Sequence, residues 1–175
     1  MKGDTFISSQ IDVMITEKVN DMTKGPFMEF MRLETAAAAD GEVVSEGFDT
    51  PASRTEKMAM LIHQIHLFCP ISKTLTGEVK TSIGDREATE VSDIDIGEPG
   101  IITKMECYTL GTPDNYQTNE HQITYYSPPI LYAKRQIWAS VANQGSTGGK
   151  KCSAHIGYTV EKVSREDFIS ALVEG

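Results

Sequence analysis

Histidines are the first candidates for chemistry in this chain, because neutral imidazoles bind transition metals. His63 and His66 stand three residues apart in the segment HQIH, and His121 and His155 lie elsewhere in the sequence. The residues around HQIH have the composition of an apolar strand, and residues three apart in a strand face opposite sides. These two side chains therefore cannot bind one metal ion unless a bulge interrupts the strand. We expect no metal site and no cofactor.

Motifs for nucleophilic catalysis and for phosphate binding are missing. There is no GxSxG elbow, and Cys69 precedes a proline in an apolar segment, where a thiol is structural rather than reactive. The segment GSTGGKK, residues 145–151, lacks P-loop spacing and precedes a strand rather than a helix. A cupin-type metal site needs an HxH pair with a glutamate close behind, whereas the next glutamate after HQIH is Glu78. The sequence therefore predicts a protein that is not an enzyme.

Carboxylate pairs are the remaining catalytic candidates. Asp93 and Asp95 form one pair and Glu87 and Glu90 another, and such pairs can bind calcium or act on glycosides. Their neighbours in the segment GDREATEVSD are polar and turn-forming. We therefore interpret both pairs as solvated surface.

Aromatic side chains offer binding rather than catalysis. Trp138 is the sole tryptophan, and Tyr125, Tyr126 and Tyr132 precede it. An aromatic ring on a sheet can stack on a sugar or anchor a contact between subunits. Half-buried packing is the other interpretation of the tyrosines. We count Trp138 among the candidate interface residues.

Composition narrows the class of protein further. The 175 residues carry a formal net charge of −9, which argues against strong direct binding of nucleic acid, since that requires clustered Lys and Arg. Three widely spaced cysteines, Cys69, Cys107 and Cys152, form no CxxC pair, so we expect reduced, mostly buried thiols. The longest apolar run is too short for a membrane span, and the first residues lack the apolar core of a signal peptide. We expect a soluble globular protein.

The elements that must position these residues are mostly strands. Short runs of β-branched and aromatic residues alternate with Gly, Pro, Asn and Asp. The predicted extended segments are residues 5–19 (Ile11, Val13 and Ile15 on one side), 42–48, 54–69, 71–83, 101–110, 120–127, 130–142 and 151–163. Residues 27–34 are expected to form either a further strand or a short apolar segment of another type. Pro128 and Pro129 are expected to stop the strand before them, because proline cannot donate to a ladder.

The segment of residues 54–69 is apolar on both sides, which is typical of a central strand. One face is expected to hold Met58, Met60, Ile62 and Phe68, and the other Ala59, Leu61, Ile65 and Leu67.

The last third of the chain has the clearest pattern. Residues 130–142 and 151–163 are predicted to pair as a long antiparallel hairpin through the Gly-rich loop NQGSTGGK. The buried face is expected to hold Ile137, Ala139 and Val141 in the first segment, and Ile156, Tyr158 and Val160 in the second.

A short helix is predicted after Val163. Ser164 and Asp167 form a capping box, and Val163 and Phe168 a hydrophobic staple. The apolar stripe of this helix supplies the other candidate interface residues, which are Phe168, Ile169, Leu172 and Val173.

About eight strands and one late helix predict an all-β protein, an antiparallel β-sandwich of jelly-roll type with a short C-terminal helix, forming a single domain over residues 1–175. A closed barrel is the second choice.

The C-terminal third, from PPILYAKRQIWASVA through IGYTVEKVS to the last helix, resembles the end of a single jelly-roll capsid protein of small icosahedral viruses. The resemblance implies a structural subunit that assembles with copies of itself, and with other virion proteins, into an icosahedral shell. It also implies a virion location after assembly in the host cytoplasm. Many such proteins carry a basic N-terminal arm that binds the genome, and the N-terminus MKGDTFISSQ is not basic. The alternative is a lectin-like carbohydrate-binding sandwich that uses Trp138 or the pair Tyr125 and Tyr126.

Overall fold

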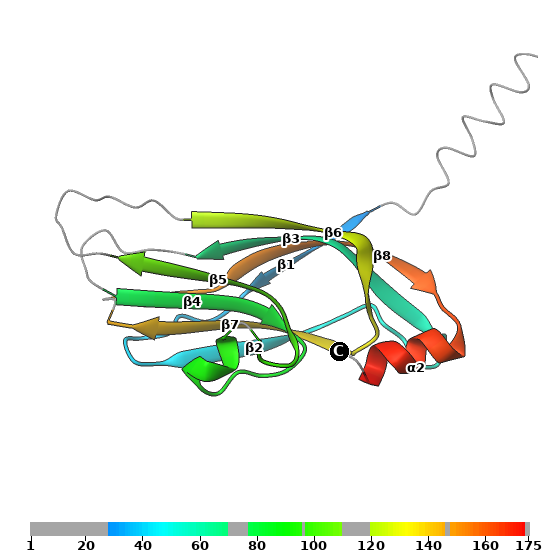
Figure 1. Cartoon of the computed structure of the whole chain (residues 1–175), viewed down its shortest axis with the longest axis horizontal. Coiled ribbons are helices and arrows are strands. Elements are labelled where there is room, and N and C mark those ends of the chain that lie inside the picture. The colour runs from blue at the N-terminus through cyan, green and yellow to red at the C-terminus, as the bar shows by residue number, and fades with distance from the viewer. Residues whose placement is uncertain (1–27, 70–76, 96, 110–119, 146–147, 174–175) are drawn as a thin grey trace, which may run out of the picture.

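Eight strands and two short helical elements make up the part of the chain that the structure describes (Figure 1). The computed structural model describes residues 28–69, 77–95, 97–109, 120–145 and 148–173, so the strand predicted in residues 5–19 lies outside the described residues. The strands are β1 (Glu29–Glu34), β2 (Val43–Asp49), β3 (Met58–Cys69), β4 (Gly77–Gly84), β5 (Ile101–Thr109), β6 (Glu120–Tyr132), β7 (Gln136–Gln144) and β8 (Ser153–Lys162). The 3-10 helix η1 spans Val91–Ile94, and the C-terminal helix α2 spans Arg165–Val173.

The strands form two antiparallel four-stranded sheets that pack face to face (Figure 1). Sheet I has the order β1-β8-β3-β6 and sheet II the order β2-β7-β4-β5. The first strand pairs with the last, β2 with β7, β3 with β6, and β4 with β5. This nested pairing is a long hairpin folded over on itself, which is the jelly-roll form of the sandwich. The predicted fold class is confirmed.

The main core lies between the sheets and contains the inward side chains of both. As predicted, Ile137, Ala139 and Val141 point inward from β7. Ile156 and Tyr158 point inward from β8, with Val160 packed against them. Each of these isoleucines is fully buried, and such burial stabilises the fold by roughly 1.5–3 kcal/mol per side chain.

The predicted pairing of residues 130–142 with 151–163 is wrong. β7 belongs to sheet II, between β2 and β4, and β8 belongs to sheet I, between β1 and β3. Residues 130–132 end β6, and the chain then passes to sheet II before β7 begins. The alternation identified the buried face of each segment correctly. The two faces meet across the core because the strands lie in opposite sheets.

A bulge in β3 changes which of its residues point inward. The register of β3 with both neighbours shifts between Ile62 and Gln64, so His63 is the extra residue. The inward residues are Met60 and Ile62 before the bulge, and Ile65, Leu67 and Cys69 after it. Phe68 therefore lies on the opposite face of the strand from Met60, whereas Ile65 and Leu67 lie on the same face as Met60. This corrects the two predicted faces. The prediction that this strand is central in its sheet is confirmed.

Strand β6 continues through Pro128 and Pro129, which were predicted to end it. In the register of β3 with β6, Ile62 faces Ile130 and Gln64 faces Tyr125. His63 alone therefore stands opposite residues 126–129. The prolines occupy this bulge, and β6 is the edge strand of its sheet, so their missing N–H groups leave no ladder position unfilled.

Helix α2 begins where the sequence predicts, with one bond of the predicted capping box. The backbone N–H of Asp167 donates to Ser164 Oγ over 3.1 Å, and Asp167 Oδ2 accepts a hydrogen bond over 2.6 Å from the Ser164 hydroxyl, where a capping box has one from the Ser164 backbone N–H. Val163 and Phe168 belong to one apolar cluster, which confirms the staple. Phe168 packs on Ala59 and Ala133, where β3 begins and β6 has ended. The helix therefore covers one end of the sandwich (Figure 1).

Candidate functional site

The predicted interface residues of α2 divide between the two sides of the helix. Phe168 is buried, and Leu172 packs partly against the same cluster. Ile169 and Val173 are exposed by 48% and 78%. The structure therefore leaves Ile169 and Val173 available to a partner, whereas Phe168 and Leu172 hold the helix on its own chain.

Trp138, the other predicted interface residue, lies on the outer face of sheet II, since its neighbours Ile137 and Ala139 point into the core. Its cross-strand neighbours are Gly47 on β2 and Gly84 on β4. A Cβ atom added to Gly47 would lie 3.1 Å from Trp138 Cζ2, so the indole rests on the backbone of that glycine. The indole ring can lie against this backbone because Gly47 has no side chain.

A cavity of about 460 Å³ opens beside the indole. It is lined by Asp49, Asp85, Lys134, Arg135, Gln136 and Trp138. Asp85, whose side chain is 5% exposed, forms an ion pair with Lys134. Gln136 Nε2 donates to Asp49 Oδ1 over 3.4 Å. The cavity therefore places an aromatic ring beside two carboxylates and two cations.

Sequence reasoning missed the charged residues of this cavity, which come from three separate segments. The run Lys134, Arg135 and Gln136, which ends two residues before Trp138, was the available signal. Asp49 joins them because it ends β2 opposite Gln136. Asp85 joins them because it follows β4, the other neighbour of β7. Those two contributions depend on strand order, which alternation does not reveal.

The tyrosines differ in burial, so the two predicted roles, packing and surface contact, fall to different residues. Tyr132 is buried, and its hydroxyl donates to the carbonyl oxygen of Gln136 over 2.6 Å. Burial raises the pKa of Tyr132, and the nearby charge of Asp85 raises it further. Tyr126 is half-buried and donates to the carbonyl oxygen of Ile102, and burial raises its pKa. Tyr125 is 70% exposed and is the tyrosine of this group that can serve as a surface anchor.

Tyr125 belongs to a group of exposed apolar residues on sheet I. The strongly exposed large apolar side chains of the described residues are Met28, Phe30, Ile123, Tyr125, Ile169 and Val173. The first four lie on or next to β1 and β6, the two edge strands of sheet I, and the last two lie on α2. None of this set lies on sheet II. We call these six residues the apolar surface set.

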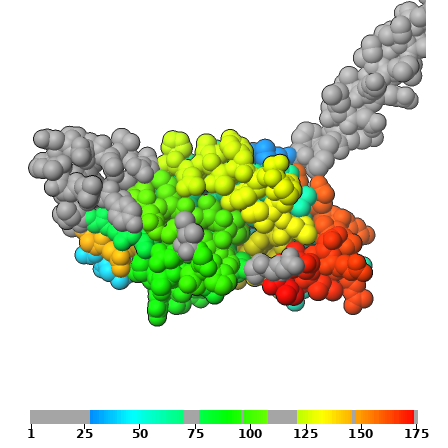
Figure 2. Space-filling view, in the orientation of Figure 1, coloured from blue at the N-terminus to red at the C-terminus, as the bar shows by residue number. Residues whose placement is uncertain are grey.

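One row across sheet I joins members of this set. Phe30 faces Gly157, Gly157 faces Gln64, and Gln64 faces Tyr125. Between the two aromatic ends, the side chains of Gln64 and Met28 lie over Gly157, because a Cβ atom built on that glycine would lie 2.8 Å from Gln64 Cγ and 3.1 Å from Met28 Sδ. The space-filling view shows β6, in yellow, at the surface next to α2, in red (Figure 2).

The histidines gather on this same outer face of sheet I. His66 faces His155 directly across β3 and β8, and His63 Nε2 lies 2.9 Å from Thr159 Oγ1. The ring of Phe68 contacts His121 and His155. Because of the bulge in β3, His63 and His66 lie on one face, which corrects the prediction that they point apart. Within the described ranges, no three His, Cys, Asp or Glu residues are arranged to hold a metal ion.

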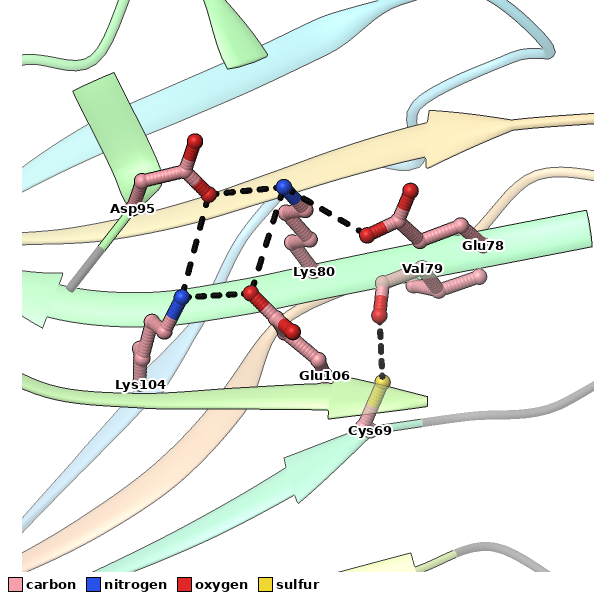
Figure 3. A network of polar contacts seen from close by, with 7 residues as sticks. All are labelled: Cys69, Glu78, Val79, Lys80, Asp95, Lys104 and Glu106. Atoms are coloured by element: carbon pink, nitrogen blue, oxygen red, sulfur yellow. Dashed lines mark hydrogen bonds and ion pairs between the residues drawn. The ribbon is translucent and has the colours of Figure 1, made fainter. Parts of the chain in front are cut away.

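The outer face of sheet II carries a network of charges instead (Figure 3). Lys80 Nζ donates to Asp95 Oδ1 over 2.6 Å and lies 3.4 Å from Glu78 Oε1. Lys104 pairs with Glu106 and lies 3.7 Å from Asp95. Burial lowers the pKa of Lys80, but the hydrogen bond to Asp95 and the nearby carboxylates outweigh it, so the pKa is raised overall. The hydrogen bond from Lys80 lowers the pKa of Asp95.

This network attaches residues 85–100 to the sheet, which the sequence presented as solvated surface. Ile94 and Ala88 are buried against Ala142 of β7. The backbone N–H groups of Thr89 and Glu90 donate to Asp93 Oδ2, and these bonds lower the pKa of Asp93. Asp93 therefore has structural partners within this segment, and Asp95 has its partners, Lys80 and Lys104, on β4 and β5. Both carboxylates lie at the surface, and the side chain of Asp95 is 46% exposed.

The three cysteines are buried and form no disulfide with one another, as expected. Cys69 Sγ donates to the carbonyl oxygen of Val79 over 3.6 Å (Figure 3). Burial raises the pKa of Cys152 to about 12. Such a thiol carries very little of the thiolate that nucleophilic chemistry requires.

In the part of the chain that the structure describes, no helix is long and apolar enough to span a bilayer. No family model matches the chain, and no curated protein matches it.

Proposed function

We propose that this protein is a structural subunit that assembles with copies of itself into a closed, icosahedral shell of the viral capsid type. The observation that carries the proposal is the uneven distribution of exposed apolar surface on the jelly roll. All six residues of the apolar surface set belong to sheet I or α2, whereas the outer face of sheet II is charged. Exposed apolar groups gathered on one side of a protein favour contacts with a partner.

A shell is built from one chain by repeating a few complementary contacts under symmetry. The row from Phe30 to Tyr125 supplies one candidate contact, and the exposed side of α2, with Ile169 and Val173, supplies another. A shell needs at least two different contacts per subunit, whereas a simple dimer needs only one. The role is structural rather than enzymatic.

The net charge of −9 sets the conditions for assembly. Like-charged subunits repel one another, and the range of this repulsion falls to about 10 Å at 0.1 M salt. We expect assembly to increase with salt. An acidic shell subunit also requires that the genome be enclosed with little direct contact to this chain. The proposal implies a protein of the virion that is assembled in the host cytoplasm, with room for other virion proteins.

Light scattering after size-exclusion chromatography, followed by negative-stain microscopy, tests the proposal on the purified full-length chain. We expect large closed particles at moderate salt. The double variant Phe30→Ser, Tyr125→Ser should shift the population to small species, whereas Glu87→Ser, at an exposed position of the 85–100 segment, should assemble normally. Circular dichroism checks that each variant is folded. A monomer at every salt concentration and pH would contradict the proposal.

A further inference from the structure

The cavity beside Trp138 has the size of a small-molecule site, and its lining is mostly polar. Its volume of about 460 Å³ lies within the range of roughly 300–1,000 Å³ that is usual for ligand pockets. It lies where β2 ends, β7 begins and the chain leaves β4, so three segments of sheet II converge on it. Neither the core nor the apolar surface set uses any of its six lining residues.

The indole supplies the apolar part of this site. Trp138 is partly exposed and lies against Gly47, and its ring lines the cavity. A flat aromatic ring at a cavity wall favours a ligand with a flat apolar face, such as the C–H groups on one side of a pyranose ring. The backbone beneath the indole holds it in place, so little conformational entropy is lost on binding.

The polar groups around the indole match a ligand that both donates and accepts hydrogen bonds. The carboxylate of Asp49 accepts, and the guanidinium of Arg135, which is exposed, donates. Asp85 and Lys134 neutralise each other at the cavity wall. Two acids and two bases make the lining neutral overall. Sugar hydroxyl groups can satisfy both kinds of partner, whereas a phosphate would face the carboxylates of Asp49 and Asp85.

We propose that this cavity binds a neutral pyranose sugar, with the indole of Trp138 stacked on the sugar ring and with Asp49 and Arg135 bonded to its hydroxyl groups. The site is independent of assembly, because its residues are separate from those proposed as subunit contacts. On a shell, it would give each subunit a means of attaching to glycans.

The single tryptophan makes the experiment specific, since all indole fluorescence of the chain comes from Trp138. The full-length protein is titrated with methyl glucoside, methyl galactoside, methyl mannoside and N-acetylglucosamine, with sorbitol as an acyclic polyol and inorganic phosphate as an anion. We expect a saturable change in Trp138 emission with at least one neutral pyranoside and none with sorbitol or phosphate.

Two variants test the assigned contacts. Asp49→Asn and Arg135→Gln should each weaken the affinity about tenfold, the effect of one charge-assisted hydrogen bond. Arg165→Gln, at an exposed position on α2, is the matched control and should bind as the parent does. Thermal unfolding of each variant verifies the fold. Absence of saturable binding by every neutral pyranoside, a response to phosphate alone, or binding that both pocket variants retain in full would overturn the proposal.

Discussion

Replacement of Gly100 by alanine tests how Asp85 is held at the wall of the cavity. Gly100 has a φ of +90°, and a Cβ atom built on it would lie 2.0 Å from Asp85 Oδ1. That carboxylate is almost fully buried and forms an ion pair with Lys134. The Gly100→Ala variant can therefore fold only if the Asp85 carboxylate moves, and we expect this movement to break its ion pair with Lys134.

The expected cost has two parts. A non-glycine residue at positive φ costs roughly 1–2 kcal/mol. Breaking a buried ion pair costs about 3–5 kcal/mol, but the Lys134 side chain is 26% exposed and water can hydrate it, so we take about 2 kcal/mol for this part. Gly100→Ala should therefore lower the free energy of unfolding by about 3 kcal/mol in total.

Gly97 offers a matched control three residues earlier in the same segment. It has a φ of +101°, and an added Cβ would meet nothing within 4 Å. Gly97→Ala should therefore cost only the backbone part, about 1 kcal/mol. Urea denaturation followed by circular dichroism measures both variants. In a double-mutant cycle, Gly100→Ala should lose most of its excess cost when Asp85 is already alanine. Equal costs for the two glycine variants, or additivity with Asp85→Ala, would refute the steric argument.

Three further outcomes are expected. The pKa of Cys152 is raised to about 12 by burial, whereas an unfolded thiol ionises near pH 8.5, so stability should fall as pH rises above that value; urea unfolding at neutral and alkaline pH should show a smaller loss for Cys152→Ala. The pKa of Asp95 is lowered by its hydrogen bond from Lys80, so its contribution is complete above the ordinary aspartate pKa of about 3.9 and is lost as the pH falls through the lower folded value; thermal unfolding should show a smaller acid loss for Asp95→Asn. Ser164→Ala removes the cap of α2 and should cost about 1 kcal/mol in the free energy of unfolding, whereas Ser164→Thr should retain most of it.

Alternation along the chain was enough to identify the fold class and many buried positions. Ile137, Ala139 and Val141 are inward because apolar residues at every second position must share one face of a strand. Alternation does not determine which strand lies next to another in a sheet. The period of two is identical whether Ile156 lies beside Ile137 in one sheet or opposite it in another, and this is why the predicted hairpin was wrong.

Local irregularities explain the other differences. One extra residue at His63 reverses the parity of β3, and only the register with its neighbours reveals it. Pro128 and Pro129 were predicted to end β6, yet an edge strand with a bulge accommodates them. Capping follows from residues a few positions apart, which is why the start of α2 could be predicted from Ser164 and Val163.

The cavity beside Trp138 was the hardest feature to predict, because its lining residues come from segments that are far apart in the sequence. Trp138 could be singled out because it is the sole tryptophan, and Lys134 to Gln136 are its neighbours in sequence. Asp49 and Asp85 reach the cavity only through the order β2-β7-β4. A binding site assembled at the junction of nested strands cannot be read from any single segment.

The nested pairing also orders the events of folding and synthesis. β4 and β5 are separated by the shortest stretch of chain, so their ladder can close first, at the smallest loss of loop entropy. Each later pair joins strands that lie farther apart in the sequence, and Glu29 can meet Tyr158 only after the chain between them has been synthesised. On the ribosome, β1 emerges first and β8 last of the eight described strands, so β1 must wait before it gains its partner. Until that moment its edge is unpaired, so the speed with which the last strand arrives governs how long the nascent chain is open to aggregation.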